Sequence, residues 1–272
     1  MIEKPVNSIS TWLFSNLLKY GNIHHFISGR IGGTSSPPYD SLNLGFHVGD
    51  DPREVLGNRR VLASALGISL NDFVFAQQIH DSRIKVVTTD ERGNGAIRQE
   101  TALEATDALV THTHDICIIL LVGDCVPVLF FDPNKNVIGV AHAGWRGTVR
   151  MIARNTVRVF QERFGCSPED IVVGIGPSIG PCCYEVGPEV IDEVESVHCS
   201  GKGLIETRTH EGRGHLNLWE ANKIQLMEAG VPEGNIETAE MCTYCNHRQF
   251  FSRRYQKGET GRFGAGIMLK AA

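Results

Sequence analysis

The stretch Cys125–His142, CVPVLFFDPNKNVIGVAH, decides the fold expected for this chain. Its two apolar runs, Val126–Phe131 and Val137–His142, have the length of buried strands, and the turn residues between them predict a β-hairpin. This pairing places Cys125 and His142 opposite one another or one pair apart, with Cβ atoms about 5 Å apart. Such a thiol and imidazole can share a metal ion or form a nucleophile–base pair. The alternative is a buried cysteine beside a structural histidine, because free cysteine is among the most buried residue types.

Further apolar runs predict the partners of this hairpin. We expect Ile116–Val122 and Ile171–Ile175 to join it in one central sheet, since short continuous apolar runs are typical of strands buried on both faces. A last strand is expected at Ala265–Leu269. Helical periodicity and capping residues mark three longer segments, Pro52–Leu66, Thr148–Phe164 and Asn217–Ala229. The pattern predicts the α/β class.

Arg59 interrupts the apolar face of the first predicted helix. It falls on the same stripe as Val55 and Leu62, so its guanidinium is expected to enter the interior. A buried guanidinium needs acceptors there. The acceptor could be a carboxylate or another group, and we expect a structural ion pair rather than a substrate contact.

Length and composition bound the remaining possibilities. The chain has 272 residues without a repeat or a long linker, so we expect a single domain over residues 1–272. Its net charge of −5, without a Lys/Arg-rich run, argues against nucleic acid or an anionic membrane as the main partner. The first residues lack the pattern of a secretion signal, and no apolar stretch is long enough to span a bilayer. We expect a cytoplasmic protein.

In such a compartment the eight cysteines are expected to be thiols or metal ligands. Cys242 and Cys245 form a CxxC, which is half of a zinc ribbon, but the chain has no second CxxC. Cys182 and Cys183 would have to complete such a site in an unusual arrangement. We therefore interpret these four residues as structural thiols.

A glycine-rich turn follows the hairpin. The segment His142–Gly147 leads from the second strand into a predicted helix at Thr148, and free amide groups at such a helix start favour an anion. Arg146 in this turn could clamp a phosphate or carboxylate. The alternative is a tight turn in which Arg146 pairs with Asp124.

A metal site needs a third protein ligand besides Cys125 and His142. His80 follows an apolar strand-like segment, whereas His112 and His114 form an HxH that also suits zinc or copper. The local pattern does not decide between them. Two imidazoles and one thiolate would suit Zn(II) with an open fourth position, as in catalytic zinc sites.

Several motifs together resemble a known family. They begin at Ser28–Arg30 and continue through Tyr39–Gly45. Together they span almost the whole chain and occur in the order found in that family. The most specific are Gly123–Cys125, Ala141–Gly147, Gly176–Tyr184, Cys242–Asn246 and Phe251–Arg254. They are similar to the laccase-domain or multicopper polyphenol oxidase family, whose members are now described as purine nucleoside phosphorylases.

The resemblance implies a fold and a site. The fold would be an α/β/β/α-type sandwich of mixed β-sheets flanked by helices, similar to Cys-hydrolase-like toxins. The metal ligands would be His80, Cys125 and His142, holding Zn(II), with Cu(II) as the alternative. The family usually has Gln-Val-His-Gly at the first ligand, where this chain has the sequence QIHD.

The implied activity is phosphorolysis of adenosine, inosine, guanosine and S-methyl-5′-thioadenosine, together with adenosine deamination. Phosphate would be held near Arg146, with Arg30 and Asn43 lining the same cleft. Cys125, His142 and Asp124 would be the catalytic residues, with Asp124 as a proton shuttle or, alternatively, as a residue that caps the turn or holds Arg146.

Three other functions stay open at this point. Cys125 and His142 could form a metal-free hydrolase or amidase that edits peptidoglycan precursors, a role linked to some relatives. A copper-dependent polyphenol oxidase fits poorly, because a multicopper oxidase needs several HxH pairs and this chain has one. A non-catalytic protein that binds zinc or nucleosides is the third.

Overall fold

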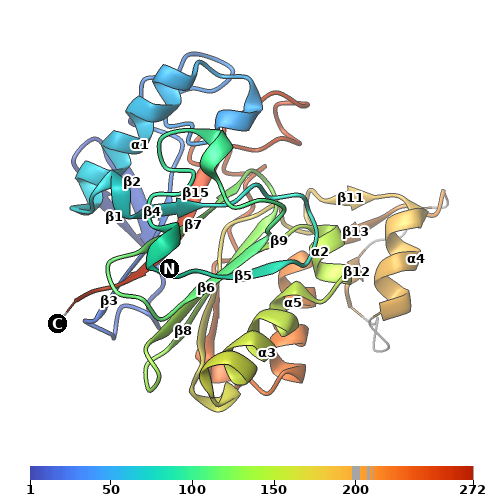
Figure 1. Cartoon of the computed structure of the whole chain (residues 1–272). Helices are drawn as coiled ribbons and strands as arrows, with labels where there is room; N and C mark the ends of the chain where they lie inside the picture. Colours follow the sequence, from blue (N-terminus) through green and yellow to red (C-terminus); the bar gives the residue numbers. More distant parts are fainter. Residues whose placement is uncertain (198–202, 207–208, 210, 272) are drawn as a thin grey trace.

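Two six-stranded sheets packed against each other form the centre of the molecule, with helices on their outer faces (Figure 1). The computed structural model describes residues 1–197, 203–206, 209 and 211–271. The predicted α/β class, with mixed sheets flanked by helices, is confirmed. No helix in the described part of the chain is both long enough and apolar enough to cross a membrane.

The first sheet has the strand order β1-β2-β3-β15-β7-β4. Its pairs are antiparallel except for β4 and β7, which run parallel. The strands are β1 (Ile2–Val6), β2 (Ile9–Leu13), β3 (Ile23–Ser28), β15 (Phe263–Leu269), β7 (Cys117–Val122) and β4 (Phe73–Phe75).

The second sheet has the order β14-β10-β8-β9-β6-β5, with parallel pairs at both edges. The strands are β14 (Ile236–Thr238), β10 (Val172–Ile175), β8 (Val126–Asp132), β9 (Val137–Ala143), β6 (Ala108–Thr111) and β5 (Ile84–Val86). The predicted hairpin and its neighbour β10 are therefore confirmed. The expectation that β7 shares this sheet is wrong, because β7 lies in the first sheet between β15 and β4. Strands β7, β8, β9 and β10 are buried on both faces, so their sequences are alike and do not reveal which sheet each one joins.

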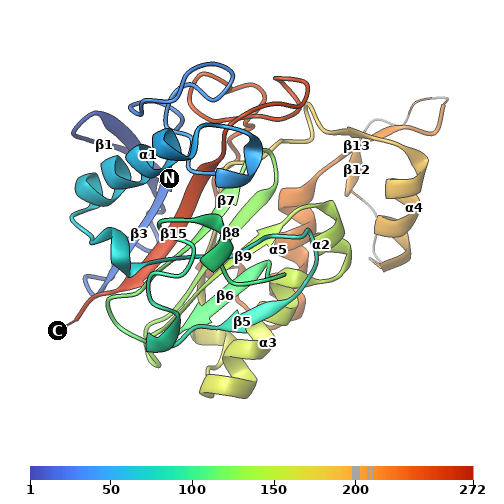
Figure 2. The same cartoon turned by 45° about the horizontal axis from the view of Figure 1, so that its top comes forward.

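Helices cover both outer faces. Helix α1 (Pro52–Leu66) packs on the first sheet, and α3 (Ile152–Phe164) and α5 (Leu218–Glu228) pack on the second. A small sheet of β11 (Glu185–Val186), β13 (Gly214–Leu216) and β12 (Ile205–Glu206) lies with α4 (Pro188–Val197) at one side of the sandwich (Figure 2). The remaining elements are α2 (Trp145–Val149) and six 3-10 helices, Phe46–Val48, Leu70–Asp72, Thr89–Glu91, Gln99–Thr101, Pro168–Asp170 and Glu233–Asn235.

The two sheets bury a continuous apolar layer between them. Ile118 and Leu120 of β7 face the same cluster as Phe131 of β8 and Val140 of β9, and all four side chains are fully buried. Burial on this scale supplies the main stabilising term of the fold, about 25 cal/mol for each Å² of apolar surface. The layer also fixes the position of β7 relative to β9. Both strands lead into the candidate active site.

The predicted boundaries of α1 and the start of α5 are confirmed, whereas the interior of α1 differs from the expectation. Arg59 is 1% exposed and donates to backbone carbonyl oxygens, including those of Leu44 and Ala96. Its guanidinium also lies over the rings of Phe46 and Phe75. The expected carboxylate partner is therefore wrong; burial lowers the pKa of Arg59 to about 9, and carbonyl dipoles with aromatic faces replace the ion pair.

The helix predicted over Thr148–Phe164 is two helices. Helix α2 ends at Val149, and Met151 takes a left-handed conformation with φ 60° before α3 begins. The carbonyl oxygen of Thr148 accepts hydrogen bonds from the side chain of Gln225 and from the amide of Met151, which closes a tight turn. Contacts with α5 therefore break a helix that its own periodicity predicts as continuous.

A buried histidine makes the fold sensitive to acid. His25 is 6% exposed, and its Nε2 accepts a hydrogen bond from the amide of Phe14 at 2.9 Å, which requires a neutral ring. Burial lowers the pKa of His25 to about 4, below the 6.5 of an unfolded chain. The folded state thus binds fewer protons than the unfolded state between these values. The contribution of His25 to the free energy of unfolding should therefore be complete above pH 6.5. We expect the free energy of unfolding to fall by about 3 kcal/mol as the pH falls through 6.5 toward 4.

A His25→Gln variant tests this, because glutamine can keep the acceptor for Phe14 without titrating. The free energy of unfolding, measured with urea at several pH values, should fall less on acidification for His25→Gln than for the unaltered protein. His112→Gln, at an exposed position, is the control. Equal acid limbs for all three proteins would contradict the assignment.

Candidate active site around a Cys-His-His metal centre

Three potential metal ligands meet at one end of the hairpin. Cys125 directly precedes β8, and His142 near the end of β9 lies opposite Pro127. The offset between Cys125 and His142 is therefore two residues, more than the sequence indicated, and the two side chains are diagonal neighbours on one face of the sheet. Together with His80 their ligand atoms lie within 4.8 Å of one another.

His80 reaches the hairpin from the first sheet. It lies in the loop that follows β4, with a left-handed φ of 59°. Its ring stands at 77° to that of His142, with a centroid distance of 4.8 Å. A Cβ atom at Gly144 would lie 3.0 Å from Cys125 Sγ and 3.4 Å from the His80 ring, so the glycine of the turn leaves room for both ligands.

The sequence analysis missed the residue that orients this cluster. Asp107 is fully buried, and its Oδ1 lies 2.9 Å from His142 Nδ1. The same carboxylate accepts the backbone amides of Ile79, His80 and Asp81 at 2.9 to 3.2 Å. One side chain therefore fixes the ring of His142, directs its Nε2 toward the cluster, and holds the loop that carries His80. The only signal for it was an acidic residue directly before the apolar strand β6.

The electrostatics of the cluster favour a thiolate. Burial opposes ionisation of Cys125, yet the charges and hydrogen bonds of His142 and His80 lower its pKa to about 6. Burial likewise opposes protonation of His142, but Cys125 and Asp107 raise its pKa to about 9. Both shifts favour a thiolate–imidazolium pair in the metal-free protein. A metal ion would take the place of the proton on His142 Nε2.

This donor set fits a zinc ion. Two imidazoles and a thiolate are typical zinc ligands, and three protein ligands leave one position for water or substrate. The hydrogen bond from His142 to Asp107 is the carboxylate–histidine pair found behind many metal ligands.

The cluster opens into a cavity of about 620 Å³, a size suited to a nucleoside-sized ligand. Its lining is strongly basic: among the described residues, five cationic side chains line the cavity, and Asp124 is the only acidic one. Aromatic and apolar side chains line much of the remainder. The basic lining residues are Arg146, Arg253, Arg254, Lys257 and Arg262; the others include His47, Gln78, Leu121, Trp145, Ile179, Tyr184 and Leu218.

Arg146 lies in this cavity, in the first turn of α2, with its guanidinium 4.2 Å from the centroid of the Trp145 ring. Helix α2 has only five residues, so its dipole adds little to anion binding. Positive charge in this cavity therefore comes mainly from side chains. The alternative partner for Arg146, Asp124, is engaged elsewhere.

Asp124 joins the cavity wall to neighbouring loops. Its two carboxylate oxygens accept hydrogen bonds from the Thr243 hydroxyl and from the Arg254 amide, both at 2.7 Å. Its backbone has φ 94°, at the point where the chain passes from β7 in the first sheet to β8 in the second. The geometry gives Asp124 a positioning role, and its part in proton transfer stays a proposal.

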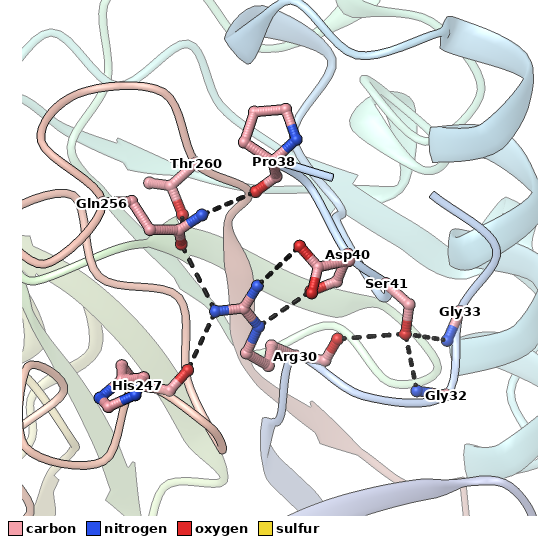
Figure 3. Close-up of polar contacts among 9 residues, drawn as sticks. All are labelled: Arg30, Gly32, Gly33, Pro38, Asp40, Ser41, His247, Gln256 and Thr260. Carbon is pink, nitrogen blue, oxygen red and sulfur yellow. Dashed lines mark hydrogen bonds and ion pairs between the residues drawn. The ribbon is translucent and has the colours of Figure 1, made fainter. Parts of the chain in front are cut away.

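Arg30 is not among the residues that line the cavity. Figure 3 shows its guanidinium surrounded by protein acceptors: the carboxylate and carbonyl of Asp40, the carbonyl of His247 at 2.9 Å, and the side chain of Gln256. The side chain also lies over the ring of Phe251. Arg30 thus ties the N-terminal motif to the loop that carries the basic residues 253–262.

Asn43 likewise lies behind the cavity. It is fully buried, and its Oδ1 accepts the backbone amide of Arg262 at 2.9 Å while its Nδ2 donates to Asp50. The structure brings neither Asn43 nor Arg30 to the cavity surface; both hold the segment that presents Arg262.

Two lining residues that the sequence analysis did not single out have shifted pKa values. Burial lowers the pKa of His47 to about 4, with help from the nearby charge of Arg262, so its ring is neutral at pH 7. Burial raises the pKa of Tyr184, so its hydroxyl stays protonated and can donate. His112, the rival ligand, instead packs near Phe164.

Fold and site together define an α/β sandwich protein with a Cys-His-His centre in a basic cavity of small-molecule size. The chain belongs to the family described as multi-copper polyphenol oxidoreductase laccase, whose model matches residues 24–270. This confirms the family resemblance of the sequence motifs.

Named relatives agree. The chain is 44% identical over 241 residues to a purine nucleoside phosphorylase YlmD of Geobacillus stearothermophilus, covering 89% of this chain and 88% of the relative. It is 38% identical over 242 residues to an adenosine deaminase RL5 of an unknown prokaryotic organism, covering 89% and 91%. A crystal structure of YlmD from Geobacillus stearothermophilus matches with a TM-score of 0.93 at 38% identity, over 98% of both chains.

Removing the charge of Asp107 should weaken the metal centre. In Asp107→Asn an amide NH₂ would face the backbone amides of the His80 loop or the Nδ1–H of His142, so both ligands lose their orientation. We expect zinc affinity, measured by competition with a chelating dye, to fall about 10- to 100-fold.

Asp132→Asn is the matched control. Asp132 is also fully buried and also accepts backbone amides, but it lies at the other end of the hairpin. Its zinc affinity should be unchanged. Equal affinities in the two variants would show that Asp107 does not support the centre.

Proposed function

We propose that this protein is a cytoplasmic, zinc-dependent purine nucleoside phosphorylase. Its substrates would be adenosine, inosine, guanosine and S-methyl-5′-thioadenosine, with adenosine deamination as a second activity. One observation carries the proposal: the Cys125, His142 and His80 cluster shares a single cavity with five cationic residues. The names of the relatives support the same class of reaction.

The basic lining of the cavity suits phosphate. Guanidinium groups bind phosphate through charge-assisted hydrogen bonds, and Arg146 at the start of α2 shares one space with Arg254 and Arg262 from the loop before β15. Phosphate held there would attack C1′ of the ribose as the bond from C1′ to the purine nitrogen breaks. The purine leaves with the electron pair and takes up a proton.

The aromatic part of the lining suits the nucleoside. Trp145 and Tyr184 offer aromatic faces for a purine, and the protonated Tyr184 hydroxyl and the neutral His47 ring offer hydrogen bonds without a competing charge. Either of these two side chains could assist the leaving purine.

His80, Cys125 and His142 would hold the zinc ion at the floor of this cavity. When bound, zinc would polarise a substrate atom and make water more acidic, which suits both phosphorolysis and hydrolytic loss of ammonia from adenine. Asp107 keeps His142 in the ligating orientation. Asp124, beside Cys125, would keep Arg254 and Thr243 in place. It is also the carboxylate that would transfer a proton.

The copper oxidase alternative has less support. In the part of the chain that the structure describes, a single cluster contains histidine, and its ligands are two imidazoles and one thiolate. A multicopper oxidase needs further copper sites within reach.

The decisive test is phosphate dependence. Inosine incubated with the zinc-loaded protein should yield hypoxanthine and ribose 1-phosphate only when phosphate is present, as measured by liquid chromatography. Cys125→Ala should reduce this turnover by at least about a hundredfold because a metal ligand is lost. Cys166→Ala, at a buried cysteine outside the cavity, should keep it.

Other outcomes of this experiment point elsewhere. Hypoxanthine release at an equal rate without phosphate would refute phosphorolysis. A Cys-His hydrolase is the second candidate, because His142 lowers the pKa of Cys125 and so favours the thiolate that such a nucleophile needs. It would show an acyl adduct on Cys125 by mass spectrometry with amide substrates, and activity that survives removal of zinc.

Arg146 tests the phosphate site separately. Losing one charge-assisted hydrogen bond costs about 1.5–3 kcal/mol, so Arg146→Met should raise KM for phosphate about 10- to 100-fold and change KM for inosine much less. Arg150→Met is the control, since Arg150 ends the same short helix but pairs with Asp81 at 2.7 Å outside the cavity lining. A phosphate KM that is unchanged in Arg146→Met would contradict this assignment.

A further inference from the structure

A second group of potential metal ligands lies outside the cavity. Cys182 and Cys183 follow β10, and Cys242 and Cys245 follow β14, yet the four Sγ atoms lie within 4.8 Å of one another. None of the four lines the cavity. Treating them as unrelated structural thiols, as the sequence suggested, does not account for this convergence.

The distances fit a tetrahedral ion better than any pairing of thiols. Cys245 Sγ lies 3.5 Å from Cys183 Sγ and 3.8 Å from Cys182 Sγ. Four sulfurs bonded to zinc at about 2.3 Å in a tetrahedron are about 3.8 Å apart. A disulfide needs about 2.05 Å. The four side chains are therefore spaced like the ligands of one ion.

The backbone brings the two segments together independently of any ion. Ser178 and Cys242 form a parallel bridge, and the amide of Thr243 donates to the Ser178 carbonyl at 2.9 Å. The amide of Gly180 donates to Cys242 Sγ at 3.2 Å, and a Cβ atom at Gly180 would lie 2.6 Å from the ring of Trp219. The glycine thus allows an approach in which a backbone amide can stabilise a thiolate.

We propose that Cys182, Cys183, Cys242 and Cys245 form a second metal centre, a closed four-thiolate site for Zn(II). Soft thiolates favour zinc over calcium or magnesium, and four protein ligands leave no open position, so the site would be structural. Cys182 and Cys245 are exposed, which gives an ion access from solvent, while Cys242 is 5% exposed and anchors the site to the core.

This centre would brace the wall of the cavity. Ile179 precedes the Cys182–Cys183 pair in the sequence and Tyr184 follows it, and both line the cavity. On the other segment Thr243, next to Cys242, donates to Asp124. An ion joining the two segments would therefore hold three contacts of the active-site wall without touching substrate.

Metal content provides the test. Full-length protein without a histidine tag, purified under reducing conditions with added zinc, should contain two zinc ions per chain by mass spectrometry of the metal. The double variant Cys182→Ser, Cys245→Ser should contain one, and Cys166→Ala should keep two. Cobalt loaded in place of zinc should give the strong thiolate charge-transfer bands of a four-sulfur site, and the double variant should lose them. Its Tm should also fall.

A second measurement covers the case in which the double variant does not fold. In the unaltered zinc-loaded protein, the exposed thiols of Cys182 and Cys245 should resist a maleimide until a chelator is added, as judged by peptide mapping. Immediate labelling of both residues in zinc-loaded protein, a stoichiometry of one zinc ion that the double variant retains, or two ions in the double variant would each overturn the proposal. None of these results depends on the reaction catalysed in the cavity.

Discussion

The hydrogen bonds of the Asp107 carboxylate are the constraint on which the site depends. This side chain is fully buried and would be costly there without partners, yet it receives three backbone amides and the imidazole of His142. The amides belong to the loop that carries His80 from the first sheet, and His142 belongs to the second. The same carboxylate therefore joins the two sheets at the Cys-His-His cluster and, with Cys125, stabilises the charged form of His142.

The position of the site follows from where the chain changes sheets. Strand β7 ends at Val122 in the first sheet and β8 begins at Val126 in the second, so the segment between them must turn across the sandwich. Asp124 makes this turn with a left-handed backbone, and Cys125 follows it directly. A side chain at such a crossing, here that of Cys125, can contact side chains from both sheets. Neither sheet alone would bring these residues together. The apolar layer between the sheets holds the strands on either side of this crossing.

The sequence predicted those parts of the molecule that local chemistry determines. The hairpin, the bounds of α1 and the start of α5 after Asn217 follow from periodicity and capping residues. Sheet membership of β7 and the break before α3 depend on tertiary contacts that periodicity does not encode. Cys125 and His142 follow from the hairpin, whereas His80 as their third partner came from the motif resemblance. Asp107 was missed because a lone acid before a strand has no distinctive spacing.

Arg30 and Asn43 show how a motif can be noticed for one reason and act for another. Both belong to polar N-terminal motifs, which suggested contact with substrate, but their donors and acceptors are used by the protein itself. Because a buried guanidinium must be fully hydrogen-bonded, Arg30 requires the loop at His247 to keep one conformation. That loop leads to Arg253 and Arg254, and Asn43 fixes the amide of Arg262. The basic lining of the cavity is thus preorganised, because its charged residues are held by the protein before an anion binds. The entropic cost of ordering the loop on binding is therefore smaller.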